Sequence, residues 1–494
     1  MWKPFAVALS AVLFILGTGL HPMPWFTWLA PLPVLLVAAR VRFRMALAAG
    51  FAVWALGQAP MWRYFLNVVE IPLPILVLSQ LAPALLFGLL TAGFGTLVRR
   101  GRPVSAALLV PAGWAVVEYA FSVAMPHGAW WSLAYTQADV LPVLQTASLT
   151  GAWGVTFLLL AVPSAVAAAL SGTAGRARLA LTFGTVVAVA LAYGTFQLLG
   201  SAPSATGRIA TERIATGRGG PAGGDRIALL VTDHPNDTIP VDTAEGRDLV
   251  ARYAARAEAL AARGVRTIVL PEKTFRVRPE TMAALAPLSR VATRHRVTIV
   301  AGLVQERGQG ANNVALALPS GVRYVKKHLI PGVENEVQPG EGTLALLPGT
   351  TEGMIICKDL DYPELVRAFR ARGATVLYAP AWDFVDDGWL HGRMAVTRGV
   401  ESGVTVARAA RAGTLVVSDP RGRIVAETTS DGDFATLTTP LPAPAPPTLY
   451  ARVGDWFPWT CAVMLAVTVG AAALRRPQPP TQQPTRHPKT ATAH

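Results

Sequence analysis

The segment GMIICKDLDYPELVRAFRA (353–371) begins as an apolar, strand-like run and continues into a helix at 363–371. The same alternation recurs on both sides of it. Strands are expected at 227–233, 267–272, 297–304, 314–319, 323–330 and 375–381, helices at 245–264, 279–294 and 389–403, and late strands in VTVARAA (404–410), TLVVSD (414–419), IVAETT (424–429) and FATLTTPL (434–441). This order predicts an α/β domain over 226–445, in which helices cover a sandwich of two sheets.

Three reactive side chains fall at or near the ends of these strands. Glu272 ends TIVLPE, Lys326 lies in YVKKHLIP, and Cys357 ends GMIICKD. A thiolate is a nucleophile, a carboxylate serves as its base, and an ammonium stabilises an oxyanion, so the three form a sufficient set for acyl transfer. The spacing alone leaves the simpler interpretations open, namely a buried core cysteine and two solvated charges.

The remaining candidates for a metal site or a disulfide are weak. His328, His391 and Asp383 match no spacing typical of metal ligands, and the chemistry above needs neither a metal nor another cofactor, so we expect none. The second cysteine, Cys461, lies in a hydrophobic segment, so a disulfide with Cys357 is not expected.

Long apolar segments flank the α/β domain. The chain is 52% hydrophobic and 15% charged, whereas soluble domains average about 25% charged residues. A spanning helix needs about 20 apolar residues. We expect about seven spans in a transmembrane domain over 1–200, and an eighth at 456–474; the seven are 5–21, 24–40, 44–61, 71–97, 104–123, 143–170 and 178–200.

The basic residues predict the orientation of these spans. Arginines cluster in alternate connections, in RVRFR (40–44), in VRRGR (98–102), at 176 and 178, and again at 475 and 476. By the positive-inside rule these connections are cytoplasmic, which places the α/β domain outside. The same rule explains the net charge of +14 better than nucleic-acid binding does. Residues 201–225 are predicted to form a linker, and 475–494 a disordered cytoplasmic tail.

One carboxylate lies within the fifth predicted span, Glu118 in WAVVEYAFS. An ionisable group at membrane depth faces the interior of a helix bundle or a wet cavity. It therefore either packs between helices or lies near a portal for lipid or substrate. Trp114, Trp130 and Trp131 are expected in the aromatic belt of the interface.

The three reactive residues lie in motifs that resemble those of the nitrilase, or carbon–nitrogen hydrolase, superfamily. The motifs read VLPE (269–272), YVKKHLIP (324–331) and ICKDLDYPE (356–364). The resemblance implies an α-β-β-α sandwich with Glu272 as base, Lys326 as cation and Cys357 as nucleophile. Together with the spans, it predicts an α-helical membrane bundle carrying a nitrilase-like α/β domain.

The full order of segments resembles the bacterial apolipoprotein N-acyltransferase family. The similarity includes 114–159, 398–425 and 449–459. It implies an enzyme in which Cys357 takes an acyl chain from a membrane phospholipid as a thioester. The chain then passes to the α-amino group of the S-diacylglyceryl cysteine of a diacylated prolipoprotein. A multi-pass protein of the bacterial inner membrane, monomeric and with its catalytic domain on the periplasmic side, is expected.

The sequence departs from that family near the reactive residues. Glu334 stands where the family has another important carboxylate, but Gly332-Val333 precedes it where the family has Phe-Gly. Lys358-Asp359 follows the nucleophile where the family has Tyr-Glu; Lys358 adds a cation that could lower the pKa of the thiol. These changes leave the acceptor open, so a paralogous acyltransferase, a membrane-anchored amidase or hydrolase, and a non-enzymatic membrane protein stay as alternatives.

Overall fold

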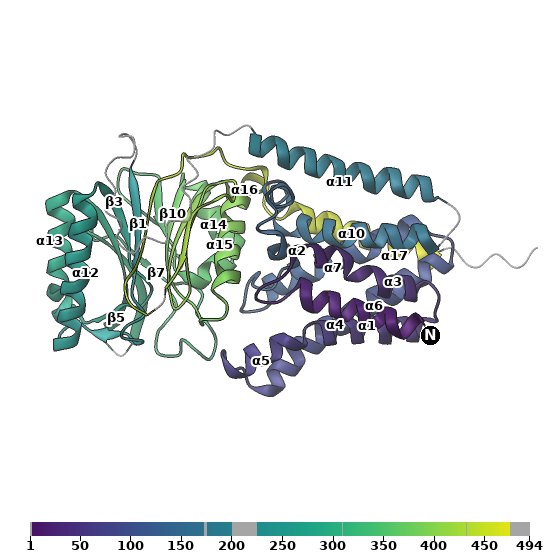
Figure 1. The fold of residues 1–494 in the computed structure, drawn as a ribbon, viewed down its shortest axis with the longest axis horizontal. Helices are drawn as coiled ribbons and strands as arrows, with labels where there is room; N and C mark the ends of the chain where they lie inside the picture. The colour runs from purple at the N-terminus through teal and green to yellow at the C-terminus, as the bar shows by residue number, and fades with distance from the viewer. Residues whose placement is uncertain (1, 172–174, 200–224, 309, 431, 475–494) are drawn as a thin grey trace, which may run out of the picture.

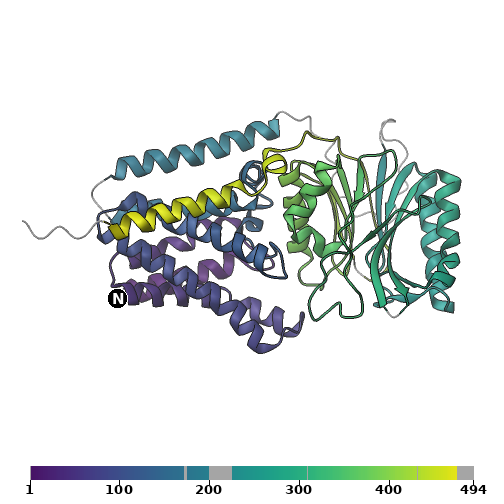
Figure 2. The same cartoon turned by 180° about the vertical axis from the view of Figure 1, so that it is seen from behind.

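The computed structural model describes residues 2–171, 175–199, 225–308, 310–430 and 432–474. They form a helical domain and an α/β domain, which lie end to end along the long axis of the molecule (Figures 1 and 2). The predicted linker at 201–225 falls outside these residues except for Asp225, and the predicted tail at 475–494 falls outside them entirely.

The helical domain contains four helices that are long and apolar enough to cross a membrane. They are α6 (Leu73–Arg99), α7 (Pro103–Ala124), α10 (Ala152–Ser171) and α11 (Arg176–Leu199). Shorter helices complete the domain: α1 (Trp2–Gly17), α2 (Pro24–Leu29), α3 (Pro31–Ala38), α4 (Phe43–Gly57), α5 (Ala59–Asn67), η1 (Leu133–Gln137), α8 (Leu141–Leu144), α9 (Ala147–Thr150) and, from the end of the chain, α17 (Trp456–Leu474).

Two of the expected spans are interrupted. The segment 24–40 divides into α2 and α3 at Pro31, which has no N–H to continue a helical ladder. The segment 143–170 breaks at Gly151, whose φ is +70°. A Cβ at Gly151 would lie 2.6 Å from the ring of Tyr450, so glycine alone fits there. The break exposes the N-terminus of α10, where Ala152 N–H donates to the Glu401 carboxylate of the α/β domain at 2.7 Å.

Glu118 of α7 lies at the centre of a fully paired polar cluster. Its carboxylate accepts hydrogen bonds from Ser132 Oγ (2.7 Å), Thr156 Oγ1 (2.8 Å), Leu133 N–H (2.9 Å) and Trp114 Nε1–H (3.2 Å). The side chain is 3% exposed. These contacts join α7, η1 and α10, so of the two interpretations offered by the sequence they support helix packing over a portal.

The α/β domain consists of two sheets packed face to face. The first runs β14-β1-β3-β5-β4-β2, with β6 paired to β5 and β7; the second runs β13-β12-β11-β10-β9-β8. The strands are β1 (Arg226–Val231), β2 (Ile239–Pro240), β3 (Val265–Val269), β4 (Phe275–Val277), β5 (Thr298–Arg307), β6 (Gly310–Leu318), β7 (Arg323–Val325), β8 (Ala345–Leu346), β9 (Glu352–Met354), β10 (Val376–Trp382), β11 (Thr405–Arg411), β12 (Thr414–Ser418), β13 (Ile424–Thr429) and β14 (Ala435–Pro440).

Helices cover both outer faces of this sandwich, and one pair separates it from the helical domain. The helices and 3₁₀ segments are α12 (Ala244–Ala262), η2 (Pro279–Leu285), α13 (Ala286–His295), η3 (Cys357–Asp361), α14 (Pro363–Ala371), α15 (Gly388–Ser402) and α16 (Leu449–Val453). Helices α12 and α13 form the far layer, whereas α14 and α15 lie between the second sheet and the helical domain (Figure 1). The predicted fold class, a helical bundle with an α-β-β-α sandwich, is confirmed.

The sandwich core is apolar, because residues from both sheets point into one layer. Leu229, Val269 and Val300 of the first sheet meet Ala379 and Val417 of the second in a single buried cluster. Strands β1, β3 and β5 run parallel, as do β10 and β11. The segment that follows β3 contacts the end of β10 in the other sheet, because Glu272 N–H donates to Ala381 O at 3.3 Å.

The buried position of Glu118 predicts a large cost for its removal. In Glu118→Ala, four buried donors lose their acceptor, and we expect the stability of the protein in detergent to fall by about 3 kcal/mol. Thermal unfolding of the purified protein measures this. The control is Glu341→Ala, which removes an exposed carboxylate; equal unfolding temperatures for the two variants would contradict the role given to Glu118.

Candidate active site

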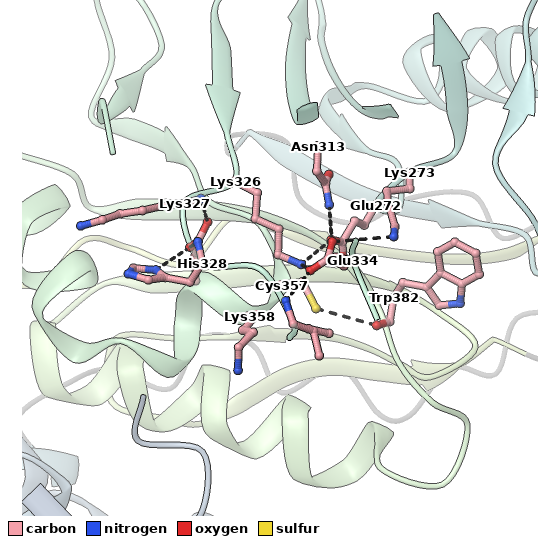
Figure 3. Close-up of polar contacts among 12 residues, drawn as sticks. Glu272, Lys273, Asn313, Lys326, Lys327, His328, Glu334, Cys357, Lys358 and Trp382 are labelled. Atoms are coloured by element: carbon pink, nitrogen blue, oxygen red, sulfur yellow. Dashed lines mark hydrogen bonds and ion pairs between the residues drawn. The ribbon is translucent and has the colours of Figure 1, made fainter. Parts of the chain in front are cut away.

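Glu272, Lys326 and Cys357 meet at one end of the sandwich (Figure 3). Glu272 lies just after β3, Lys326 directly after β7, and Cys357 begins η3 after β9. Both β7 and β9 are shorter than the sequence suggested. Lys326 N–H still donates to Asn313 O of β6, but beyond it the chain leaves the ladder, because the N–H groups of Lys327 and His328 donate to the Asp359 carboxylate at 3.1 and 2.8 Å.

Lys326 is the centre of a buried ion cluster. Its Nζ donates to Glu272 Oε1 at 2.8 Å and to Glu334 Oε2 at 2.6 Å. Asn313 Nδ2 bridges the same two carboxylates, at 2.6 Å from Glu272 Oε1 and 3.0 Å from Glu334 Oε1. The exposed fractions of Glu272, Lys326 and Glu334 are 2%, 1% and 3%, so Lys326 pairs with both carboxylates almost out of contact with water, and Lys273 adds a second cation 3.7 Å from Glu334 Oε1.

This pairing fixes the charge states within the cluster. Burial opposes a charged Lys326, but the charges of Glu272 and Glu334 outweigh burial and hold the pKa of Lys326 well above its usual value. Burial also raises the pKa of Glu334, yet Lys326 and Lys273 outweigh it and leave that pKa below its usual value. Lys326 is therefore an ammonium and Glu334 a carboxylate at neutral pH.

Cys357 is held in an uncommon backbone conformation. Its φ is +40°, in the left-handed region that non-glycine residues rarely adopt. Backbone of this kind persists where the surrounding structure enforces it, and it clusters at active sites. The thiol donates to the carbonyl oxygen of Trp382, with Sγ 3.8 Å from that oxygen.

The surroundings of Cys357 keep its thiol protonated in the resting protein. Burial and the negative charge of Glu272 raise the pKa of the thiol, whereas Lys326 and Arg408 lower it; the net effect is a raised pKa. A thiol in this state becomes a nucleophile when a neighbouring base removes its proton as it attacks. Glu272 is the carboxylate placed to do so (Figure 3).

The side chains of Asp359 and Lys358, the two residues that follow Cys357, point in different directions and have different partners. Asp359 is fully buried and accepts from Tyr324 Oη at 2.7 Å and from the backbone N–H groups of 327 and 328. It therefore connects η3, which begins with Cys357, to the motif YVKKHLIP (324–331) that contains Lys326. Lys358 does not take the expected place beside the thiol. It reaches Asp361 at 3.4 Å and points away from Sγ (Figure 3).

A cavity of about 1160 Å³ opens in front of the ion cluster. Glu272, Lys326 and Glu334 line its floor, and Val333 and Val385, two exposed apolar side chains of the α/β domain, line it further out. His21 and Val68 of the helical domain complete the lining. The cavity is therefore shared by the two domains, and its polar floor continues into apolar walls.

A second cluster, Asp383, Asp387 and His391, brings three potential metal ligands within 4.8 Å of one another. Its potential ligand atoms already have hydrogen-bond partners: Arg408 forks onto both oxygens of Asp383, Tyr64 Oη and Phe384 N–H donate to Asp387, and Trp130 Nε1–H donates to His391 Nε2. The guanidinium of Arg408 stands where a cation would be repelled. The donor set fits a hydrogen-bond network and not a metal ion.

The sequence did not point to two contributors to the site. Asn313 orients both carboxylates, and the carbonyl of Trp382 accepts from the thiol. A buried asparagine within the apolar strand GANNVALAL was a signal that could have been used, because a polar group in a strand core needs partners. A backbone carbonyl leaves no sequence signal.

Both domains match families of known proteins. Residues 10–165 match the apolipoprotein N-acyltransferase N-terminal domain, and 235–441 match the carbon-nitrogen hydrolase family. The chain is thus a carbon–nitrogen hydrolase domain joined to the helical domain of an acyltransferase. It is a homologue of the apolipoprotein N-acyltransferases, as the sequence predicted.

Two apolipoprotein N-acyltransferases agree with these matches. An apolipoprotein N-acyltransferase of Geobacter metallireducens is 27% identical over 95% of this chain and 94% of its own. One from Bradyrhizobium diazoefficiens is 26% identical over 75% of this chain and 73% of its own. Among solved structures, an amidase from Nesterenkonia sp. AN1, with an acetamide moiety at its active-site cysteine, is 25% identical with a TM-score of 0.39, over 47% of this chain and 95% of that one.

The charges around Cys357 predict how its reactivity responds to mutation. Removing the ammonium in Lys326→Met takes away a charge that lowers the pKa of the thiol, so that pKa rises further and less thiolate is present at any given pH. At pH 8, in a Cys461→Ala background, alkylation of Cys357 by iodoacetamide should slow about tenfold, which is one unit of pKa. The neighbouring Lys327→Met is the matched control, and a rate for Lys326→Met equal to that control would contradict the assignment.

Proposed function

We propose that this protein is an apolipoprotein N-acyltransferase in which Cys357 carries the acyl chain between a phospholipid and a lipoprotein amine. The observation that carries the proposal is the buried Glu272–Lys326 pair beside the Cys357 thiol, in a cavity lined by both domains. The names of the relatives support N-acylation of an apolipoprotein. A phospholipid as the acyl donor is part of the proposal.

In the first step, Cys357 Sγ attacks the ester carbonyl of a phospholipid while Glu272 takes the thiol proton. A C–S bond forms, and the carbonyl electrons move onto oxygen as an oxyanion, which Lys326 Nζ stabilises as a preorganised cation. When the oxyanion collapses, the ester C–O bond breaks. Glu272 returns its proton to the departing oxygen, which releases a lysophospholipid and leaves a thioester on Cys357.

In the second step, the neutral α-amino group of a diacylated N-terminal cysteine attacks the thioester. A C–N bond forms, Lys326 again stabilises the oxyanion, and the C–S bond breaks as the intermediate collapses. Glu272 removes the proton of the attacking amine and passes it to the sulfur, which restores the thiol. The products are the amide of a triacylated lipoprotein and the free enzyme.

Glu334, Asn313 and Asp359 hold this machinery in place. Glu334, which lies beside Glu272, also accepts from Lys326 Nζ, and it accepts from Ile330 N–H at 3.0 Å. Asn313 fixes the orientation of Glu272, and Asp359 fixes the turn that carries Cys357. Because they act through other residues, these three are positioning residues.

The setting that we propose is the bacterial inner membrane, with the α/β domain on the periplasmic side. The N-terminus and the C-terminal end of α17 lie at the end of the helical domain far from the α/β domain (Figure 1). Arg102 donates to Ala471 O, near the end of α17, at 2.7 Å, which places basic residues at that same end. The positive-inside rule assigns this end to the cytoplasm. Both lipid-anchored substrates then reach the cavity from the outer leaflet.

The acyl-enzyme provides the direct test of the first step. After the purified protein is incubated with phosphatidylethanolamine and phosphatidylglycerol vesicles, intact-mass spectrometry should show one added acyl chain, and peptide mapping should place it on Cys357. Cys357→Ala should show none, and Glu272→Gln should acylate at least a hundredfold more slowly, because it lacks the base. An unmodified Cys357 in the wild-type protein would contradict the proposal.

A further inference from the structure

A chain of hydrogen bonds crosses from the helical domain to the α/β domain close to the cavity. Tyr64, on α5, donates its hydroxyl proton to Asp387, and Trp130, between α7 and η1, donates its indole N–H to His391 Nε2 at 3.1 Å. The two acceptors lie at the start of α15, and α5 projects from the bundle toward the α/β domain (Figure 1). The rings of Tyr64 and Trp130 are parallel within 7°, so the two donors form one unit.

The two acceptors hold the segment 382–388, which connects β10 to α15. Asp387 accepts from Phe384 N–H at 2.9 Å and closes the segment on itself. His391 Nδ1 lies 3.1 Å from Asp383 Oδ1 and 3.5 Å from Asp387 Oδ2. An indole N–H only donates, so Nε2 accepts and the imidazole proton sits on Nδ1, facing both carboxylates.

Burial and the neighbouring carboxylates change the pKa of His391 in opposite directions. Burial lowers its pKa, whereas Asp387 and Asp383 raise it, to about 8 overall. The hydrogen bond that Trp130 donates to Nε2 belongs to the neutral imidazole, the form that predominates above pH 8, because a second proton would need the same Nε2 lone pair. Trp130 therefore keeps the imidazole in the orientation that serves Asp383.

Asp383 connects the imidazole of His391 to the backbone that contacts Cys357. It is fully buried, is forked by Arg408, and directly follows Trp382, whose carbonyl accepts from the Cys357 thiol. A Cβ at Gly413 would lie 2.0 Å from Asp383 Oδ2, so the fit around this carboxylate is tight. The charges of Arg408 and Asp383 also act on the pKa of the thiol, in opposite directions.

We propose that Tyr64 and Trp130 are positioning residues for the acyl-transfer site, which act through Asp387, His391 and Asp383 on the segment that accepts from the Cys357 thiol. The proposal rests on the proposed function only where acylation of Cys357 by phospholipid is the measured rate. Under this proposal, the Cys357 thiol reacts at its full rate only when the helical domain is docked on the α/β domain. Two other contacts between the domains do not involve the segment 382–388. They are the ion pair Arg367–Asp455 and the hydrogen bond from Ala152 N–H to Glu401.

The test uses full-length protein in a Cys461→Ala background, with Tyr64→Phe, Trp130→Phe and the double variant. Two controls make the same chemical changes elsewhere. Trp131→Phe alters the neighbouring indole, which packs edge-on against Trp114 and Phe121, and Tyr193→Phe removes a hydroxyl that lies 2.7 Å from Ser148 Oγ. Two rates are measured, acylation of Cys357 by phosphatidylethanolamine and phosphatidylglycerol vesicles, and alkylation of Cys357 by iodoacetamide between pH 7 and 9.

We expect each of Tyr64→Phe and Trp130→Phe to slow acylation about tenfold at saturating lipid, because small misplacements of reacting groups are costly. The lipid concentration for half-maximal rate should stay within twofold. The double variant should fall short of the hundredfold product, because both residues act on one segment. The rate of alkylation should change at least threefold, with both controls unchanged.

Acylation and alkylation rates within twofold of the controls for both variants would overturn the proposal and leave the network a docking contact. If the parent protein forms no acyl-enzyme, the proposed function fails. The alkylation rates then still decide whether the network reaches the thiol, so the two failures are distinguishable.

Discussion

The ammonium of Lys326, held between two buried carboxylates, is the interaction on which the site depends. Lys326 faces both Glu272 and Glu334, and Lys273 reaches Glu334 at 3.7 Å; burial and the negative charge of Glu272 together make a thiolate at Cys357 unfavourable. The thiol therefore stays protonated until it attacks. Its proton has one nearby destination, Glu272, so that nucleophilic attack and proton transfer are coupled in one event. Once that proton has moved, Glu272 is neutral, and Lys326 can stabilise the oxyanion while Glu334 still holds it in place.

The fold supplies this geometry by bringing together segments that follow three separate strands. Glu272 follows β3 of one sheet, whereas Cys357 follows β9 of the other, so the site exists only when the two sheets pack face to face. Asp359 ties the turn of Cys357 to the lysine motif, and Asn313 ties the two carboxylates together. The helical domain then contributes part of the cavity wall and the donors Tyr64 and Trp130. Catalytic chemistry and membrane anchoring are thus joined by direct contacts.

The sequence predicted those features that short segments encode. The strand and helix periodicities predicted the sandwich. The three motifs predicted Glu272, Lys326 and Cys357 as site residues, and the structure brings these three together, although Lys326 lies after β7 and not inside a strand over 323–330 as expected. Features that depend on contacts between distant segments were missed. Tyr64 and Asp387 are 323 residues apart, and nothing local marks either as a partner of the other. The direction of Lys358 could not be predicted either, since only the folded turn shows that it faces Asp361. The need for glycine at position 151 depends on the ring of Tyr450, another long-range contact.

The central claim is that the acyl chain passes from Cys357 to an amine. It is tested most directly by isolating the protein with a radiolabelled acyl chain on Cys357 and adding a diacylated lipopeptide in a single turnover. The account predicts that the label moves to the α-amino group of the lipopeptide as an amide, faster than it appears as free fatty acid. A lipopeptide whose α-amino group is acetylated should receive none. Release of the label as free fatty acid at the same rate with and without the lipopeptide would contradict the account and identify a hydrolase.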